Sequence, residues 1–209
     1  MKRVCLDAGH GGHDVGALGP SGTTEASMTL DVCKRIRTLL EPLAEVVMTR
    51  DSDVYLTLAE RSAICNKAEC DVFLSYHFNA AESMLANGWE IFTTKRDNNS
   101  DKLATAIGDA HAAQFPRQHA RTDWSDGDLD KEANFSVIRM ADCPAVLFEG
   151  EFIHNNVGEA MILDPENRQK MAVAVAEGIS TYLNLNLKLN IPITLEQRVA
   201  MIEKHLNLS

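Results

Sequence analysis

Strand-like and helix-like segments alternate along almost the whole of this chain. Short apolar runs such as Cys70–Ser75 predict strands, and longer stretches with apolar residues three and four positions apart, such as Ser27–Leu43, predict helices. The other predicted strands are residues 2–7, Glu45–Thr49, Gly88–Thr93 (an edge strand), Ser136–Met140 and Ala145–Phe148; the other predicted helices are Leu56–Ala68, Ser100–Gln114 and Pro165–Leu183. This order predicts a single α/β domain with a twisted, mostly parallel sheet and helices on both of its faces.

The composition is that of one ordinary globular domain. The 209 residues suffice for one well-packed core, with 45% apolar and 24% charged residues. The net charge of −10 argues against nucleic-acid binding and against a basic membrane-surface patch, because both need positive charge. No run approaches the ~20 apolar residues that span a bilayer, so we expect no membrane insertion.

The cysteines and the first residues bear on the compartment. Five cysteines, at positions 5, 33, 65, 70 and 143, form no Cys-x-x-Cys pair, which favours buried thiols and synthesis in a reducing environment. Met1-Lys2-Arg3 leads directly into the first predicted strand without a visible secretory signal. We therefore expect either synthesis in the cytoplasm or a leader that has been removed.

Polar motifs follow three of the predicted strands. His10 lies in the glycine-rich turn Asp7-Ala8-Gly9-His10-Gly11-Gly12, His77 lies in Ser75-Tyr76-His77-Phe78-Asn79-Ala80, and Glu149 directly ends Ala145–Phe148. Because the carboxyl ends of strands share one rim of an open α/β sheet, we expect these side chains to meet there. Two imidazoles and a carboxylate that leave a position for water are typical of a catalytic zinc.

Two glutamates have surroundings that suit different tasks. Glu25 follows Thr23-Thr24 at the start of the first long helix, where the helix dipole favours a negative charge, although a glutamate in a first turn is also commonplace. Glu149 follows the apolar run Val146–Phe148, which should partly desolvate the carboxyl and raise its pKa. A raised pKa suits a general base that takes a proton from water.

The ordered set of motifs resembles the type-3, zinc-dependent N-acetylmuramoyl-L-alanine amidases over roughly residues 3–184. Further matching segments are Thr49-Arg50, Leu58-x-x-Arg61 with Asn66, Val137-Ile138-Arg139, Pro144–Leu147 and Phe152-Ile153-x-Asn155. The resemblance implies a peptidoglycan hydrolase that cleaves the amide between the lactyl group of N-acetylmuramic acid and L-alanine of the stem peptide. It also implies that His10, Glu25 and His77 hold one Zn²⁺ per chain and that Glu149 is the catalytic carboxylate.

The chain departs from the family pattern at two positions. Ala8 stands where the family usually has proline, and Glu151 stands where a small residue is usual. By strand alternation Glu151 would point the same way as Glu149, so it could compete as base, contact the metal shell or face a cationic group of the stem peptide. Asn79 and Asn155 either hydrogen-bond substrate or fix loops as Asx turns.

Other polar residues receive a structural interpretation. His13 is not expected to be a metal ligand, because the neighbouring glycines make a helical His-x-x-His pair improbable. Arg50 and Arg61 are expected to pair with carboxylates rather than to bind substrate. His154 is expected to be exposed, although it lies near the proposed site.

The tail and one long loop lie outside the alternating pattern. The acidic stretch Pro116–Asn134 either lines a substrate groove or is a solvated loop. Residues 1–184 are interpreted as the catalytic domain, 185–194 as a linker and 195–209 as a short amphipathic helix. Leu195, Val199, Ile202 and Leu206 form an apolar seam too short to be stable alone, so this helix either mediates homo-oligomerisation or leads to another module.

Three functional hypotheses follow from these residues. The first is a wall-lytic amidase, most like a phage or prophage endolysin that reaches peptidoglycan after release through a holin or by cell lysis. The second is a catalytically silent wall-binding or regulatory protein, against which the four intact site residues argue. The third is a zinc peptidase acting within the stem peptide, because zinc–water chemistry alone does not select the amide.

Overall fold

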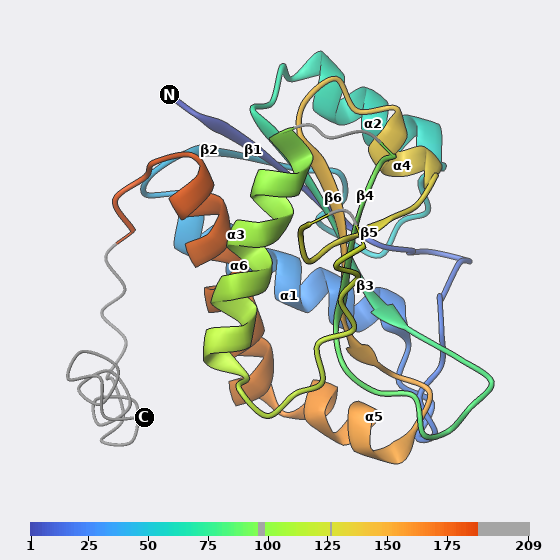
Figure 1. Cartoon of the computed structure of the whole chain (residues 1–209). Coiled ribbons are helices and arrows are strands. Elements are labelled where there is room, and N and C mark those ends of the chain that lie inside the picture. Colours follow the sequence, from blue (N-terminus) through green and yellow to red (C-terminus); the bar gives the residue numbers. More distant parts are fainter. Residues whose placement is uncertain (96–98, 126, 188–209) are drawn as a thin grey trace.

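The computed structural model describes residues 1–95, 99–125 and 127–187, and within them six strands form one sheet in the order β2-β1-β3-β6-β4-β5 (Figure 1). The strands are β1 (Arg3–Ala8), β2 (Glu45–Met48), β3 (Val72–Asn79), β4 (Glu90–Thr93), β5 (Lys131–Glu132) and β6 (Ala145–Phe152). β2, β1, β3 and β6 are mutually parallel, whereas β4 runs antiparallel to β6 and parallel to β5. The predicted mostly parallel sheet is confirmed.

Helices cover both faces of this sheet, as predicted (Figure 1). Their bounds are α1 (Glu25–Leu40), α2 (Leu58–Lys67), α3 (Asn99–Gln114), α4 (Ser136–Arg139), α5 (Asn156–Leu163) and α6 (Pro165–Tyr182). One core cluster joins α1, α3 and α6 to residues such as Val4 and Leu6, and a second joins α2 and α4 to Cys5 and Phe73. Alternate residues of β1 therefore face opposite cores, as expected for a strand covered on both sides.

Several helices begin directly after a residue whose side chain accepts a hydrogen bond from an amide of the first turn. Thr24 caps α1, Thr57 and Glu60 form a capping box at α2, and Asp164 caps α6 directly before Pro165. These side chains satisfy amide groups that have no partner inside the helix. The local sequence thus determines where α1 begins, and it places Glu25 at the first position of this helix.

The structure corrects two of the sequence interpretations. Ser136–Met140 was expected to be a strand, but Ser136–Arg139 is the short helix α4. Ser62 Oγ and Asn66 Nδ2 on α2 donate to the carbonyls of Val137 and Met140, so packing on α2 outweighs the β-branched residues of this segment. The predicted edge strand is also internal, because β5 pairs with the outer side of β4.

Two short elements, α5 and β5, were not predicted. Asn155 caps α5, and β5 contains only two residues, too few to produce a hydrophobic pattern. The predicted linker at 185–194 and the predicted helix at 195–209, with its role in self-association, fall almost entirely outside the described residues, which end at 187. None of the helices in the described part of the chain is long and apolar enough to cross a membrane.

Candidate active site

His10, Glu25 and His77 come together from three separate elements. His10 follows β1, His77 lies near the end of the neighbouring parallel strand β3, and Glu25 is the first residue of α1. Glu25 Oε2 lies 3.1 Å from His10 Nε2, and Glu25 Oε1 lies 2.9 Å from His77 Nδ1. Tetrahedral zinc, with bonds of ~2.0–2.2 Å, places its ligand atoms roughly 3.3 Å apart. The three donors therefore fit one zinc ion.

Hydrogen bonds from the backbone fix the carboxylate of Glu25. The Phe78 amide donates to Oε1 at 3.1 Å, and the Ala17 amide donates to Oε2 at 2.9 Å. Burial opposes ionisation of Glu25, but its hydrogen bonds with the two imidazoles hold its pKa well below the usual range. Glu25 is thus an ionised carboxylate with a fixed orientation.

A second layer of residues orients His10. Asp14 lies 3.0 Å from His10 Nδ1, so the Nε2 atom faces Glu25. His10 has a φ of 62°, a left-handed conformation that costs a non-glycine residue free energy. Arg61 stabilises this turn by donating to the His10 carbonyl at 2.8 Å.

Two glycines leave the space that the histidine rings occupy. A Cβ atom on Gly9 would lie 2.2 Å from His77 Cε1. A Cβ atom on Gly16, which has a φ of 68°, would lie 2.6 Å from His10 Cδ2. The close approach of these rings therefore requires glycine at both positions.

Glu149 lies beside the three donors on the next strand. It is the direct partner of His77 in the β3–β6 register, so both side chains leave the sheet on the same face. Its Oε2 atom is buried and has no hydrogen-bond partner among the described residues. Burial raises the pKa of Glu149 to about 8. An unpaired buried carboxyl group needs an explanation, and a reacting water or a metal ion supplies one.

The family model for N-acetylmuramoyl-L-alanine amidase matches residues 4–181 of the chain. The chain belongs to the N-acetylmuramoyl-L-alanine amidase family. A curated relative, the endolysin of Bacillus phage SPP1, is 34% identical over 189 residues, which cover 90% of this chain and 68% of the endolysin. The amidase LytC of Bacillus subtilis is 34% identical over 87% of this chain and 35% of LytC.

Solved structures of the amidase family share the fold. The catalytic domain of CwlV from Bacillus (Paenibacillus) polymyxa var. colistinus matches with a TM-score of 0.78 at 31% identity, covering 89% of this chain and 100% of that domain. AmiC2 of Nostoc punctiforme matches with a TM-score of 0.80 at 28% identity, covering 88% and 97%. The chain is about as long as these domains, although it spans only about three fifths of the probable cell wall amidase LytH of Staphylococcus epidermidis (59%).

Asn79, Asn155 and Glu151, for which the sequence allows a role in substrate binding, all make contacts inside the protein. Asn79 Nδ2 donates to Glu90 at 3.2 Å. Asn155 accepts from the amides of Val157 and Gly158, which is the loop-fixing alternative. Glu151 is only 4% exposed, and its oxygens accept from the Gly88 and Phe152 amides and from Gln118. The register between β3 and β6 shifts at this point, which interrupts the alternation that related Glu151 to Glu149.

The remaining polar residues named from sequence lie around this centre. The ring of His13 packs against Tyr55, with centroids 4.0 Å apart. Arg61 pairs with Asp7 at 2.9 Å, as expected, whereas Arg50 donates to the carbonyls of Ala8, Gly9 and Ala26 rather than to a carboxylate. Both arginines therefore hold the turn that carries His10. His154 Nε2 contacts the Ser83 carbonyl oxygen at 2.9 Å.

Sequence reasoning missed a charged cluster next to Glu149. Glu90 on β4 is the register partner of Glu149 and is 5% exposed. It pairs with Arg121 at 2.7 Å and with Lys131 at 2.6 Å, and both cations lie in the long acidic stretch. A glutamate inside the apolar run Gly88–Thr93 was a signal for this cluster, because a buried charge requires partners.

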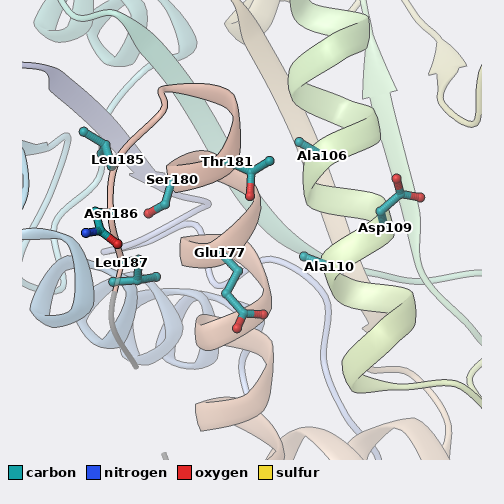
Figure 2. Close-up of a pocket in the computed structure, with 9 residues that line it drawn as sticks. All are labelled: Ala106, Asp109, Ala110, Glu177, Ser180, Thr181, Leu185, Asn186 and Leu187. Atoms are coloured by element: carbon teal, nitrogen blue, oxygen red, sulfur yellow. The ribbon is translucent and has the colours of Figure 1, made fainter. Parts of the chain in front are cut away.

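The pocket in Figure 2 is separate from this centre. It lies between α3 and α6 and the segment after α6, lined by residues such as Asp109, Glu177 and Leu187. All of its lining residues belong to these elements. His10, Glu25, His77 and Glu149 are not among its lining residues.

Proposed function

We propose that this chain is a peptidoglycan hydrolase that cleaves the amide between the lactyl group of N-acetylmuramic acid and the L-alanine of the stem peptide. The observation that carries the proposal is the convergence of His10, Glu25, His77 and Glu149 at one rim of the sheet. Membership of the amidase family supports the same reaction.

His10 Nε2, a Glu25 carboxylate oxygen and His77 Nδ1 are proposed to hold one Zn²⁺. These atoms lie within 4.8 Å of one another, and Asp14 and the backbone amides preorient them. When bound, zinc supplies a Lewis acid that lowers the pKa of water to ~7 and polarises a carbonyl oxygen.

Glu149 is proposed to be the general base and then the general acid. Its unpaired Oε2 can accept the proton of the attacking water and then donate it to the leaving amine of L-alanine. Its pKa of about 8 applies to the metal-free protein, and a neighbouring cation lowers that pKa toward the value a base needs. His77 and the strand pairing hold Glu149 at a fixed position relative to the three ligands.

Arg121 and Lys131 are proposed to face the stem peptide. Glu90 anchors both, and their side chains are still 34% and 27% exposed beside the Glu149 strand. Stem peptides carry carboxylates, which arginine binds well through its planar fork of donors. Asn79 also donates to Glu90 and lies on the same side of the site. Substrate roles for Glu151 and Asn155 remain predictions without a supporting contact.

The proposed partner is the bacterial cell wall. The likeness to the SPP1 endolysin supports a lytic enzyme that acts on peptidoglycan after release from the producing cell. The proposed oligomerisation through residues 195–209 is a separate prediction that the described residues do not test.

Amine release from purified sacculi tests the proposed reaction. We expect the wild type to release labelled L-alanine amino groups with intact muramic acid, and both Glu149→Gln and chelator-treated protein to release far less. Loss of a general base costs ~10²–10⁴-fold in rate. Glu41→Gln, which changes an exposed carboxylate at the end of α1, is the matched control and should remain active.

The products separate this proposal from its competitors. New amino groups on stem residues other than L-alanine would identify a peptidase. Zinc binding without any amine release, in the wild type as in Glu149→Gln, would identify a wall-binding or regulatory protein.

A further inference from the structure

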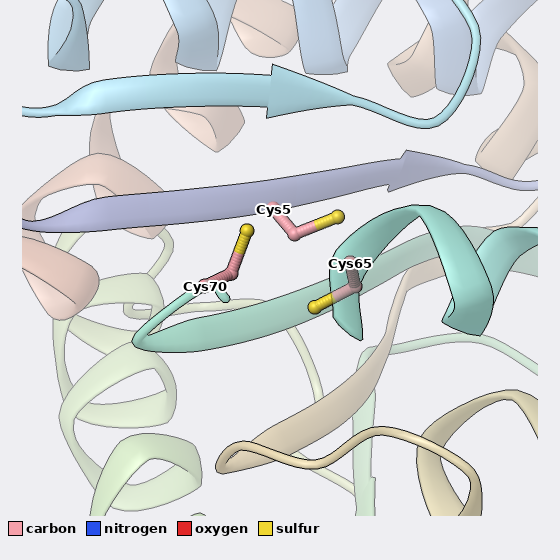
Figure 3. A group of neighbouring side chains, drawn as sticks. All are labelled: Cys5, Cys65 and Cys70. Atoms are coloured by element: carbon pink, nitrogen blue, oxygen red, sulfur yellow. The ribbon is translucent and has the colours of Figure 1, made fainter. Parts of the chain in front are cut away.

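Four of the five cysteines converge in the second core cluster, between the sheet and helices α2 and α4. Cys5 lies on β1, Cys65 on α2, Cys70 shortly before β3, and Cys143 between α4 and β6. Figure 3 shows the side chains of Cys5, Cys65 and Cys70 gathered around one space, although each comes from a different part of the chain. All are free thiols.

The sulfur atoms have spacings that suit a metal ion. The Sγ atoms of Cys5, Cys65 and Cys70 all lie within 4.8 Å of one another, and Cys143 Sγ lies 3.6 Å from Cys65 Sγ. Tetrahedral zinc with Zn–S bonds of ~2.3 Å places its sulfurs about 3.8 Å apart. The sulfurs of Cys5, Cys65 and Cys70 therefore lie close to coordinating distance, and Cys143, which lies outside this 4.8 Å group, is close to Cys65.

We propose that Cys5, Cys65 and Cys70, with Cys143 as the fourth ligand, form a thiolate site for a soft divalent cation such as Zn²⁺. Sulfur ligands select such ions, and a set without an open position is typical of structural sites. The site lies in a different core cluster from α1, and its donors differ from those at His10 and His77. Its role is to tie β1 and α2 to the segments that enter β3 and β6, and it does not depend on the proposed amidase function.

One cation lies beside the cluster and two of its thiols approach the surface, whereas the pKa values of the buried Cys5 and Cys65 thiols are raised, so metal binding must ionise them. Arg3 donates to the Ala68 carbonyl at 2.9 Å, at the end of α2, and its charge acts on the nearby Cys70 thiol. A cation at this position offsets part of the charge that several thiolates carry. Cys70 is 8% exposed and Cys143 is half-buried, so an ion has a short path to the cluster.

Cobalt substitution of the full chain tests this site without an activity assay. Reduced protein is loaded with Co²⁺ under anaerobic conditions, and both the bound metal per chain and the absorption spectrum are measured. We expect one cobalt ion at the cysteines, with the intense thiolate-to-cobalt charge-transfer absorption that imidazole and carboxylate ligands do not produce, and a second ion at the proposed site of His10, Glu25 and His77. His10→Ala should remove one ion and retain this absorption.

Two cysteine substitutions and a matched control complete the experiment. Cys70→Ser and Cys65→Ser should each weaken binding at this site and both reduce and shift the charge-transfer absorption, because one thiolate ligand is lost. Cys33→Ser, in the other core cluster, should change neither. One ion per chain without charge-transfer absorption in the wild type would overturn the proposal even if the variants fold poorly. So would an absorption in Cys70→Ser that is identical to the wild-type spectrum.

Discussion

Asp14 determines which nitrogen of His10 faces Glu25 and the proposed zinc position. Its carboxylate lies 3.0 Å from Nδ1, and its own side chain is 42% exposed. Asp14→Ala should leave the fold intact and weaken zinc binding by about 10–100-fold, the usual cost of losing a partner that orients a ligand. Competition with a fluorescent chelator measures this affinity.

Asp53→Ala is the matched control for Asp14. The Asp53 carboxylate accepts from the Gly12 amide at 2.8 Å, on the same turn, but it lies on another loop. An equal loss of zinc affinity in both variants would mean that the rigidity of the turn matters and the orientation of His10 does not.

The absence of a side chain at Gly9 admits the ring of His77. Because an added Cβ would lie 2.2 Å from that ring, Gly9→Ala should displace His77 and abolish tight zinc binding while circular dichroism stays near the wild-type spectrum. Gly22→Ala is the control, since its Cβ would meet nothing within 4 Å although its φ of 90° is strained for alanine. Zinc binding retained by Gly9→Ala would show that His77 has room to move.

Helix α2 is tied to the end of β1 by a buried ion pair. Arg61 and Asp7 are 2.9 Å apart, with side chains 3% and 1% exposed, and Asp7 also accepts from Thr49 and Ser75. Arg61→Ala leaves a buried carboxylate without its cation, so the free energy of unfolding should fall by about 3–5 kcal/mol. Denaturant titration measures it.

A surface pair on α1 provides the comparison for this effect. Arg35 and Asp31 are 2.7 Å apart but partly exposed, so Arg35→Ala should cost about 1 kcal/mol or less. A double variant of Arg61 and Asp7 should lose less than the sum of the two single changes, because the pair is coupled. Additive losses would argue that the two side chains act independently.

At the scale of the whole molecule, the sequence predicted the layered sheet and the strand-end motifs, because both rest on short-range periodicity. His10 and His77 end adjacent parallel strands, so the prediction that they meet followed from topology. The helix at Ser136–Arg139 depends instead on hydrogen bonds from α2, 74 and 75 positions away in the chain. The partners of Glu90 and the buried position of Glu151 likewise depend on long-range contacts and a register shift that no local pattern records.

The site also makes the stability of the whole metal-free molecule depend on pH. Burial raises the pKa of Glu149 from 4.5 to about 8, so the folded state keeps a proton that the unfolded state loses, and stability falls as pH rises between these values. Burial lowers the pKa of His77, but Glu25 more than offsets this and raises it from 6.5 to about 9. Protonated His77 therefore contributes its full stabilisation of the folded state below pH 6.5, and this stabilisation is lost as pH rises through 9.

Both groups therefore predict that the unfolding temperature of chelator-treated protein falls from about pH 6.5 to about pH 9, above the range in which His111, whose pKa burial lowers to about 4, acts in the opposite direction. Saturating zinc should reverse this trend, because the ion replaces the protons on the imidazoles and binds more tightly as they deprotonate. Thermal unfolding followed by circular dichroism, with chelator and with zinc, measures both curves. Glu149→Gln isolates the contribution of His77, because without the Glu149 carboxyl the unfolding temperature should fall only as His77 loses its proton near pH 9. An unfolding temperature that rises with pH over this range in the metal-free wild type would contradict the protonated Glu149 on which this argument rests.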